Sequence, residues 1–408
     1  MNIVNTGNLA SHYDLAIVGA GILGVMAALH AEQQGLKVLL LESGAKANHA
    51  TVRNFGQVVA SGQILGYWRG LGQRSSDIYQ QFAKKIALPI RQQGTFYIAG
   101  DEQEAQLLEE MAVINHQENA KSQLLSQQAV LALQPLLKKE AVINALHYPD
   151  EITIDSPDLM QCLQQHLQKN SAVDCIYGGE VKEVDGKNAN FSLYLTDLRC
   201  FKAKQVLFCC GHQSTPLLQR FYHNEALQLC KLQMMSTVAQ MRGGLTGNVL
   251  GGLSIRRYQA FASCPSYAQL SHSDYQQQLQ QHGIHLLFKQ VANGELIIGD
   301  THEYFDIHSC SSADYHLYID KQRLMWTEAQ RILNLKDDAV AKLWLGWYVE
   351  HKEGALIKSL EPGLHCVTGL GGKGMTVGPA LMQDVIAKIN KDATLESFST
   401  VLPQSMAI

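Results

Sequence analysis

The 408-residue sequence has few prolines, few charged residues and no long hydrophobic run. Charged side chains make up 17% of the chain and the formal net charge is -4, so we expect no broad basic surface for nucleic acid. No uninterrupted apolar stretch approaches the roughly 18 residues that a membrane-spanning helix needs. The chain has only nine prolines, which excludes a collagen-like protein, and its hydrophobic fraction of 46% excludes a disordered one. The sequence therefore predicts a globular protein, and its length predicts two or three domains.

Paired cysteines and known metal-binding motifs are also missing. Nine cysteines are scattered from Cys162 to Cys366 without a C-x-x-C pair, and the 16 histidines show no H-E-x-x-H spacing. We therefore expect reduced thiols and no dedicated metal site. The segment Met1 to His12 is polar and lacks the apolar core of a secretory signal. Together these features predict a cytoplasmic protein.

The strongest positive signal is a strand–turn–helix–strand unit near the start of the chain. An apolar run at residues 15–18 is followed by Gly19-Ala20-Gly21-Ile22-Leu23-Gly24, a helical pattern to Gly35, and a second apolar run at residues 38–41 that ends on Glu42. Gly19 permits a tight turn, Gly21 leaves room for a pyrophosphate, and Gly24 lets the helix pack close to the sheet. The helix start offers N–H groups to phosphates. Glu42 would accept a hydrogen bond from a ribose hydroxyl and would repel a 2′-phosphate, so the unit predicts a dinucleotide other than NADP.

A second glycine-rich turn lies far along the chain. Residues 364–368 form an apolar run that leads into Gly369-Leu370-Gly371-Gly372-Lys373-Gly374-Met375-Thr376, and a helical pattern follows from about Thr376 to Ile389. Such a loop at a helix start stabilises negative charge, which a reduced flavin develops. The loop favours FAD over NAD. An NAD-dependent hydroxy-acid dehydrogenase and a non-catalytic flavin-binding protein stay as alternatives.

With these motifs the sequence resembles the D-amino-acid oxidase superfamily of FAD-dependent amine oxidoreductases, which includes glycine oxidase and sarcosine oxidase. The first unit, a middle strand ending Cys209-Cys210-Gly211, and the final glycine loop show the resemblance over nearly the whole chain. The strings Arg53-Asn54-Phe55-Gly56 and Gly299-Asp300-Thr301-His302-Glu303-Tyr304 resemble a subgroup associated with phosphonate breakdown. The chain departs from the usual pattern at Cys210, at Lys373 and at residues 347–352, so carboxylate recognition is not transferred from better-known members.

The resemblance implies an α/β fold with a Rossmann-like, GR2-type FAD-binding domain and a second α+β substrate domain built on a mostly antiparallel sheet. The FAD-binding domain would comprise residues 1–84, 147–218 and 341–398, and the substrate domain residues 85–146 and 219–340. A helix is predicted at residues 156–168, and strands at residues 256–261 and 294–299 would form one wall of the active site.

The resemblance also implies which residues hold the cofactor. The FAD contacts would come from Gly19, Ala20, Gly21, Ile22, Leu23, Gly24, Leu41, Glu42, Ser43, Arg53, Asn54, Phe55, Gly56, Val181, Cys210, Gly211, Gly346, Gly371, Gly372, Lys373, Gly374, Met375 and Thr376.

Five residues are candidates for the reaction itself: Arg53, Arg256, Tyr258, His302 and Lys373. On a strand Arg256 and Tyr258 would share one face, and we expect this face to line the pocket; the opposite choice places Arg257 inside. Arginine and histidine would bind an anionic group, Glu303 is an alternative partner for an ammonium, and Lys373 would stabilise the reduced flavin. Trp347 and Tyr348 would form an apolar wall.

The implied function is FAD-dependent oxidation of a small anionic amine, an aminoalkylphosphonate or an amino acid. Hydride transfer to the flavin would give an imine that water hydrolyses, and no strong base is required. The partners would be the amine and O2 or another electron acceptor, with no nucleic acid and no membrane span.

Overall fold

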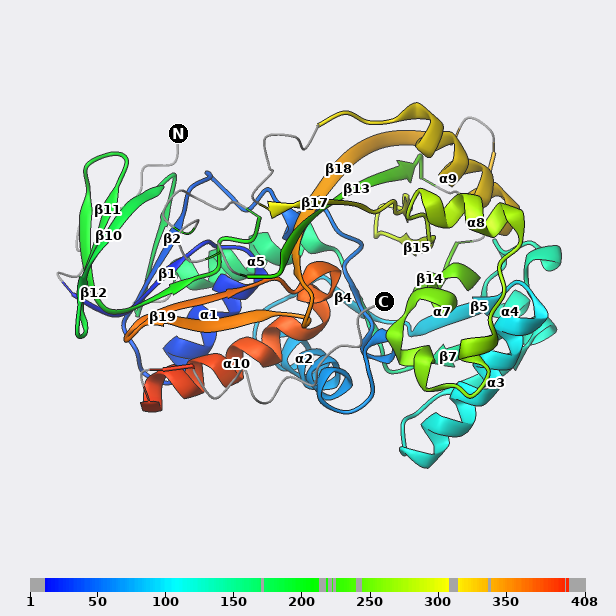
Figure 1. The fold of residues 1–408 in the computed structure, drawn as a ribbon, viewed down its shortest axis with the longest axis horizontal. Helices are drawn as coiled ribbons and strands as arrows, with labels where there is room; N and C mark the ends of the chain where they lie inside the picture. The colour runs from blue at the N-terminus through cyan, green and yellow to red at the C-terminus, as the bar shows by residue number, and fades with distance from the viewer. Residues whose placement is uncertain are drawn as a thin grey trace.

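The computed structural model describes residues 12–169, 172–212, 218, 222, 225–239, 244–307, 315–336, 339–392 and 394–395. Two large sheets lie at opposite ends of an elongated molecule, and two long strands, β13 (Leu227–Thr237) and β18 (Val340–His351), run between them (Figure 1). The other residues of the predicted domains, among them 1–11, 213–217, 219–221, 308–314 and 396–398, lie outside the described residues, as does most of the segment considered for a secretory signal. Among the described residues, no helix combines the length and apolar character needed to cross a bilayer.

The first sheet has eight described strands and a parallel centre. Strand β1 (Tyr13–Val18) lies between β2 (Val38–Glu42) and β12 (Cys200–Phe208), and both pairings are parallel. Strand β9 (Val173–Tyr177) adds to β2, and β20 (Leu364–Thr368) adds to β12, also in parallel. The antiparallel strands of the sheet are β10 (Val181–Lys187), β11 (Asn190–Leu195) and β19 (Leu356–Glu361). Buried central strands with short apolar runs are typical of this doubly covered arrangement.

Helices cover one face of the first sheet. They are α1 (Ile22–Gln33), α2 (Tyr67–Ala83), α5 (Ser156–Gln168) and α10 (Gly374–Asp392), and α10 packs against both α1 and α2. Side chains alternate along β1: Leu15 and Ile17 pack with the helices, whereas Ala16 belongs to the core on the other face. The core on that second face also contains side chains of β10, β11, β13 and β18. The sheet therefore has hydrophobic layers on both sides.

The second sheet has nine described strands and is mostly antiparallel, as predicted. Its order is β17-β13-β16-β15-β14-β5-β7-β6, and β18 pairs with the full length of β13. The only parallel pairing in this described sheet joins β14 to β5. Its other strands are β5 (Thr95–Ala99), β6 (Gln123–Ser126), β7 (Asn144–Tyr148), β14 (Asn248–Leu250), β15 (Leu287–Gln290), β16 (Leu296–Gly299) and β17 (Glu303–Asp306).

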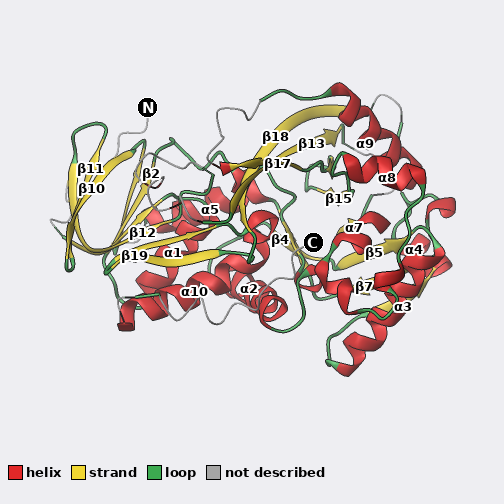
Figure 2. Cartoon of the chain, viewed as in Figure 1, coloured by secondary structure: helices red, strands yellow, loops and turns green. Residues whose placement is uncertain are grey.

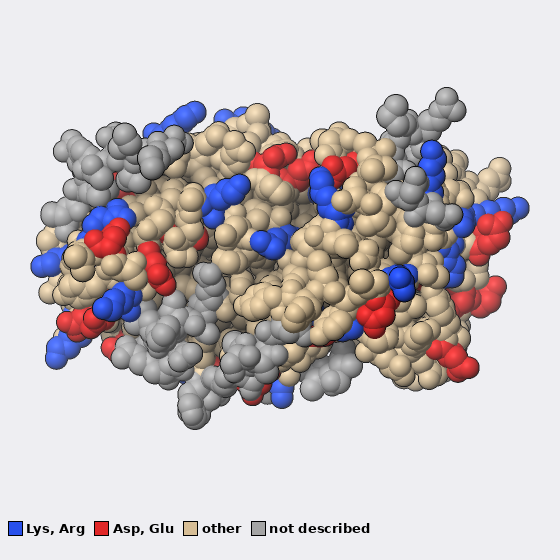
Figure 3. All heavy atoms as spheres, turned by 90° about the horizontal axis from the view of Figure 1, so that it is seen from above, with Lys and Arg blue, Asp and Glu red and all other residues tan. Residues whose placement is uncertain are grey.

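Further helices surround the second sheet, and a small third sheet completes the described structure (Figure 2). The second sheet is flanked by α3 (Glu102–Gln117), α4 (Gln127–Leu133), α7 (Gly252–Arg257), α8 (Asp274–Gln281) and α9 (Ile319–Ile332). Between the large sheets lie β3 (Gln57–Val58), β4 (Ile90–Gln92) and β8 (Ile152–Ile154), which form a three-stranded sheet. Acidic and basic side chains are interspersed on the face that Figure 3 shows.

The predicted fold class is confirmed, and most predicted elements are present. Helices α5 and α10 and strand β16 lie where the sequence predicts them. The predicted strand at residues 256–261 is wrong, because residues 252–257 form α7 and residues 259–263 a 3-10 turn. The domain division stays a prediction; at residue 341 it falls one residue into β18, a strand that pairs with β13 of the second sheet.

Candidate functional site

The first glycine turn forms a closely packed junction between β1 and α1. Gly19 has a φ of +102°, and a Cβ there would lie 2.5 Å from the Cys209 carbonyl oxygen. A Cβ on Gly24 would lie 1.8 Å from the Gly19 carbonyl oxygen, which explains the need for glycine where helix and strand meet. Helix α1 begins after Gly21, without a side-chain cap and without an acidic residue in its first turn. Its positive end is therefore suited to a phosphate.

Glu42 ends β2 beside this turn. Its carboxylate accepts hydrogen bonds from the Ala20 N–H at 2.8 Å and from the Gly44 N–H at 3.0 Å. These two contacts hold the carboxylate at the edge of a cavity, where Glu42 is one of the lining residues. The position suits a ribose hydroxyl, as the spacing of the motif predicts.

The second glycine turn opens into the same cavity. Gly369 and Gly371 follow β20 with φ values of +76° and +60°, and α10 begins at Gly374. A Cβ on Gly374 would lie 4.0 Å from Cγ2 of Ile22, so the starts of α1 and α10 are neighbours. Both turns line one cavity of about 1030 Å³. Two turns separated by about 350 residues therefore contribute to one groove.

The lining of the groove includes both glycine turns and the end of β12, the middle strand of the sequence analysis. The predicted FAD-binding residues that line it are Gly19, Gly21, Ile22, Leu23, Leu41, Glu42, Ser43, Arg53, Val181, Cys210, Gly211, Gly371 and Gly374. Residues without a predicted cofactor role also line it, including His49, Thr51, His212, Trp344 and Leu345, together with Trp347 and Tyr348. Thr51 was missed because a lone threonine in a turn has no motif; its hydroxyl accepts a hydrogen bond from the Ile22 N–H at 3.0 Å.

The remaining predicted FAD residues lie around the groove rather than on its surface. Ala20 and Gly24 pack behind the first turn, and Gly56 packs against the Ile154 carbonyl. Asn54 donates hydrogen bonds to the Ala50 and Thr51 carbonyls and so fixes the segment that precedes Phe55. Gly346 lies in β18, Gly372 in the second glycine turn, and Met375 and Thr376 in the first turn of α10. Direct contact between these residues and FAD stays a prediction.

Arg53 and Lys373 have partners within the protein. The Arg53 guanidinium donates hydrogen bonds to the carbonyls of Asn48 at 2.7 Å and Leu345 at 3.0 Å. The Lys373 ammonium lies 4.4 Å from the centroid of the Trp68 ring, and burial lowers its pKa while Glu350 opposes that shift. Their proposed roles toward substrate and flavin are not decided by these contacts.

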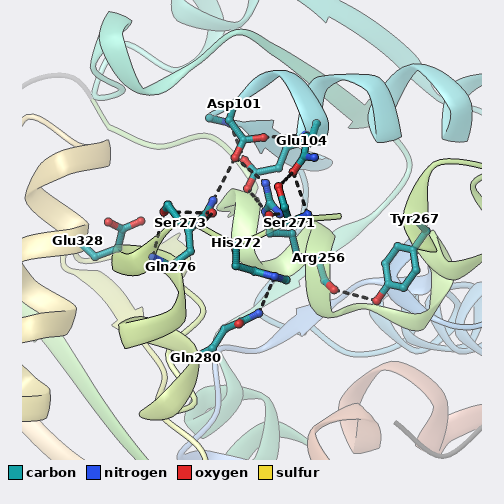
Figure 4. Close-up of polar contacts among 12 residues, drawn as sticks. Asp101, Glu104, Arg256, Tyr267, Ser271, His272, Ser273, Gln276, Gln280 and Glu328 are labelled. Carbon is teal, nitrogen blue, oxygen red and sulfur yellow. Dashed lines mark hydrogen bonds and ion pairs between the residues drawn. The ribbon is translucent and has the colours of Figure 1, made fainter. Parts of the chain in front are cut away.

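Arg256 is not a pocket residue. Its guanidinium donates to Glu104 at 2.6 Å, to Asp101 at 2.6 Å and to the Ser271 carbonyl at 2.7 Å. Figure 4 shows this side chain turned toward the start of α3, and only 1% of it is exposed. On a helix, neighbouring side chains point about 100° apart, so the strand alternation used for the prediction does not apply.

Replacing Arg256 by methionine should destabilise the fold strongly. Glu104 would be left buried without its cation, and breaking such a pair costs about 3–5 kcal/mol. The matched control is Arg74→Met, because Arg74 forms a similar pair with Asp384 at 2.6 Å but is 45% exposed. For Arg74→Met we expect the free energy of unfolding to fall by less than about 1 kcal/mol. Denaturant unfolding of both variants measures the difference; equal losses would contradict this account of Arg256.

The neighbouring Arg257 is half-buried and makes different contacts. Its guanidinium donates to the Tyr304 hydroxyl at 2.9 Å, and within the described part of the chain it has no carboxylate partner at ion-pair distance. Arg257 interacts electrostatically with Asp300 and Tyr348. Tyr348 lines the groove, and a Cβ on Gly372 of the second glycine turn would lie 3.8 Å from its ring. Arg257 therefore belongs to a polar region next to the end of the groove that this turn lines.

Tyr258 and His302 belong to the same region. The Tyr258 ring lies 6.1 Å from the ring of His285, which in turn lies 4.8 Å from the ring of His302. His302 is also 6.3 Å from the Tyr348 ring. Glu303 is occupied elsewhere, since its carboxylate lies 2.8 Å from the Lys321 ammonium. The structure thus brings Tyr258 and His302 together and leaves Arg256 and Glu303 outside.

Asp300 and His285 were missed by the sequence analysis. Ligand-capable atoms of His285, Asp300 and His302 all lie within 4.8 Å of one another. The expectation of no metal site was based on motif spacing, which does not test a grouping that a β-hairpin assembles. The geometry alone would accept a small cation or the polar end of an organic molecule. We call these three residues the His–Asp–His cluster.

The fold and groove define a protein that binds an extended dinucleotide across a Rossmann-like sheet. The groove volume, the uncapped start of α1 and the position of Glu42 fit the pyrophosphate and ribose of such a cofactor. Residues 14–387 match the model of the DAO family, described as "FAD dependent oxidoreductase". The chain belongs to this family, and its cofactor is FAD.

Comparisons with individual proteins agree on the fold. Glycine oxidase from Bacillus cereus aligns with 97% of this chain and 100% of its own, with a TM-score of 0.78 and 18% identity. L-proline dehydrogenase from P. horikoshii aligns over 97% and 96%, with a TM-score of 0.77 and 16% identity. Among curated sequences, the aerobic glycerol-3-phosphate dehydrogenase of Staphylococcus aureus is 26% identical over 171 residues. That match covers 40% of this chain and only 30% of the relative.

Proposed function

We propose that this FAD-dependent oxidoreductase oxidises a small amine that also bears an anionic group, an aminoalkylphosphonate or an amino acid. The observation that supports this best is Arg257. It is a half-buried cation next to the groove whose one hydrogen bond in the described structure goes to a hydroxyl rather than to a carboxylate. An arginine in this setting is suited to a carboxylate or phosphonate. The similar folds of glycine oxidase and L-proline dehydrogenase support an amine as the other substrate group.

One set of residues would bind the cofactor and another set would bind the substrate. The two glycine turns and Glu42 would hold FAD, and Arg257 with the Tyr304 hydroxyl would hold the anionic group of the substrate. When bound, FAD supplies a two-electron acceptor for the hydride of the carbon next to the substrate nitrogen. Tyr348 and Trp347 would shield this end of the groove from water. Positioning of the carbon–hydrogen bond would then provide much of the rate enhancement.

The structure changes how a phosphonate would be recognised. A phosphonate was expected to bind two or more of Arg53, Arg256 and His302, but Arg256 is bound to Asp101 and Glu104 and Arg53 donates to two backbone carbonyls. In their place, Arg257, Tyr304 and His302 lie near one another. We therefore infer that a phosphonate would bind here through one arginine and neutral donors. The subgroup associated with phosphonate breakdown stays part of this proposal.

The test is anaerobic bleaching of the flavin by a panel of amines. We expect bleaching by either aminoalkylphosphonates or amino acids such as glycine, N-methylglycine or D-amino acids. Ethylamine lacks the anionic group and ethylphosphonate lacks the amine, so neither should reduce the flavin. The proposal fails if no compound carrying both groups bleaches the flavin, or if ethylamine is as effective as its anionic counterpart.

A further inference from the structure

The His–Asp–His cluster is assembled by one β-hairpin. Strands β15 and β16 pair with Leu287 opposite Gly299, which places His285 beside Asp300 just beyond the pairing. The backbones of His285 and Asp300 exchange hydrogen bonds at 3.3 and 3.4 Å. His302 follows two residues later, and its ring nitrogen Nδ1 lies 3.8 Å from the Asp300 carboxylate. The same Nδ1 atom lies 3.1 Å from the Gly283 carbonyl oxygen, so the hairpin brings an acid and two imidazoles together while one ring nitrogen of His302 has a backbone partner.

The cluster contains polar atoms whose hydrogen-bonding capacity the protein does not use. His285 is 6% exposed and Asp300 is 8% exposed. Neither the Nδ1 atom of His285 nor the Oδ1 atom of Asp300 has a hydrogen-bond partner among the described residues; these two atoms are 3.5 Å apart. Buried polar atoms without partners are costly, and the cluster is linked to the groove through His302, whose ring lies 6.3 Å from that of the lining residue Tyr348. We take the two atoms to indicate a missing ligand group.

The charges around Asp300 restrict what that group is. Asp300 interacts electrostatically with Arg257 of α7, with Tyr258, with Cys230 of β13 and with Tyr348 of β18. The residue before Asp300, Gly299, is close to Phe55, since a Cβ there would lie 3.3 Å from Cζ of that ring. A bare metal ion would add positive charge beside Arg257. A zwitterion brings one charge of each sign, and each finds an opposite charge in Arg257 and Asp300.

We propose that Asp300 binds the ammonium group of the substrate and accepts its proton, with His285 and His302 as neutral neighbours. This inference rests on the proposed function, because it assigns the second half of the same substrate. The step is balanced: the ammonium N–H bond breaks, the proton bonds to the Asp300 carboxylate, and the substrate nitrogen keeps the electron pair. The neutral amine can then release a hydride from its neighbouring carbon, whereas an ammonium cannot.

The expected protonation states agree with this role. Burial raises the pKa of Asp300 to about 7, and Arg257 opposes part of that rise. Burial, and then the charge of Arg257, lower the pKa of both His285 and His302 well below the usual value, so both imidazoles are neutral. Asp300 is therefore an acceptor above about pH 7 and loses this ability as the pH falls below it.

The experiment compares wild type with Asp300→Asn as FAD-bound protein. The probes are trimethylglycine and the N,N,N-trimethyl derivative of 2-aminoethylphosphonate, whose positive charge is permanent and whose nitrogen has no proton to give. Binding is followed by the change in the flavin spectrum. For wild type, we expect the better probe to bind about tenfold more weakly for each pH unit below 7. Asp300→Asn should bind it at least about tenfold more weakly at pH 8 and lose the pH dependence.

The second readout is the rate of anaerobic flavin reduction by the corresponding amine. This rate should fall at least about a hundredfold in Asp300→Asn at pH 7, with FAD content unchanged. The matched control is Glu295→Gln, which removes a carboxylate from the far end of the same hairpin, where Glu295 pairs with Lys342 at the surface. Its binding and reduction rates should equal those of wild type.

Four results separate the two levels of inference. Normal probe binding, reduction rate and pH profile in Asp300→Asn would overturn the role of Asp300 and leave the proposed function intact. One equivalent of a divalent metal in purified wild type, absent from Asp300→Asn, would also overturn it. Equal losses in Glu295→Gln would show a non-specific effect and overturn it as well. If no amine reduces wild-type flavin and neither probe binds, the proposed function fails and this inference fails with it.

Discussion

Replacing Gly24 by alanine should remove most of the bound FAD. The added Cβ would lie 1.8 Å from the Gly19 carbonyl oxygen, so either α1 or the first glycine turn must move. Overpacking of this kind costs about 1–3 kcal/mol, and here the displaced atoms belong to the turn that would bind the pyrophosphate. We expect the affinity for FAD to fall by about tenfold or more. The ratio of flavin to protein absorbance and titration of cofactor-free protein with FAD measure the change.

A second helical glycine provides the control. Gly70 lies in α2 and a Cβ there would have no atom within 4 Å, so Gly70→Ala should keep full FAD content. It should also be slightly more stable, by about 0.5–1 kcal/mol, because alanine is the better helix former. Circular dichroism of Gly24→Ala with added FAD separates loss of cofactor affinity from loss of the fold. Normal FAD affinity in Gly24→Ala would contradict the role assigned to this junction.

Replacing Arg257 by methionine should abolish tight substrate binding while FAD stays bound. Methionine keeps much of the side-chain length but removes the charge that would pair with the substrate anion. Truncating one partner of such a pair costs about 2–5 kcal/mol, so we expect kcat/KM to fall by about 30-fold to 5,000-fold. Steady-state kinetics and the flavin-to-protein ratio measure the two effects separately.

Arg257→Lys distinguishes charge from geometry. Lysine keeps the charge but cannot form the planar two-point contact of a guanidinium, so it should restore only part of kcat/KM. Unchanged kinetics in Arg257→Met would remove this residue from the substrate site.

The parts of the fold that the sequence predicted well depend on local patterns. Gly19, Gly21, Gly24 and Glu42 belong to one motif of 24 residues. The structure explains the glycines, because a Cβ at any of the three positions would lie 3.2 Å or less from another atom. Helix α5 was equally predictable, since Pro157 lies in its first turn. Periodicity and turn chemistry are properties of short segments, so neither required knowledge of distant contacts.

The substrate side was harder because tertiary contacts override local signals there. Residues 252–257 make only one and a half turns of helix, too short for a clear helical period, and the alternation of Arg256 and Tyr258 suggested a strand. The prediction consequently placed Arg256 in the pocket, whereas the structure binds it to Glu104 and Asp101. His285 and Asp300 are 15 residues apart and meet only through the β15–β16 hairpin, so no motif spacing could reveal them. A prediction of hairpin register would have been the one available signal.

The shared groove also has a consequence for how the protein is made. Strand β1 is synthesised before its neighbour β12, before β20, which pairs with β12, and before α10, which contacts α1; these three elements come from residues 200–392. Translation at about 5–20 residues per second separates these events by roughly 20 seconds or more. Assembly of the groove therefore has to wait until α10 has been synthesised, and the first dinucleotide-binding unit spends that interval without the strand and helix that complete it.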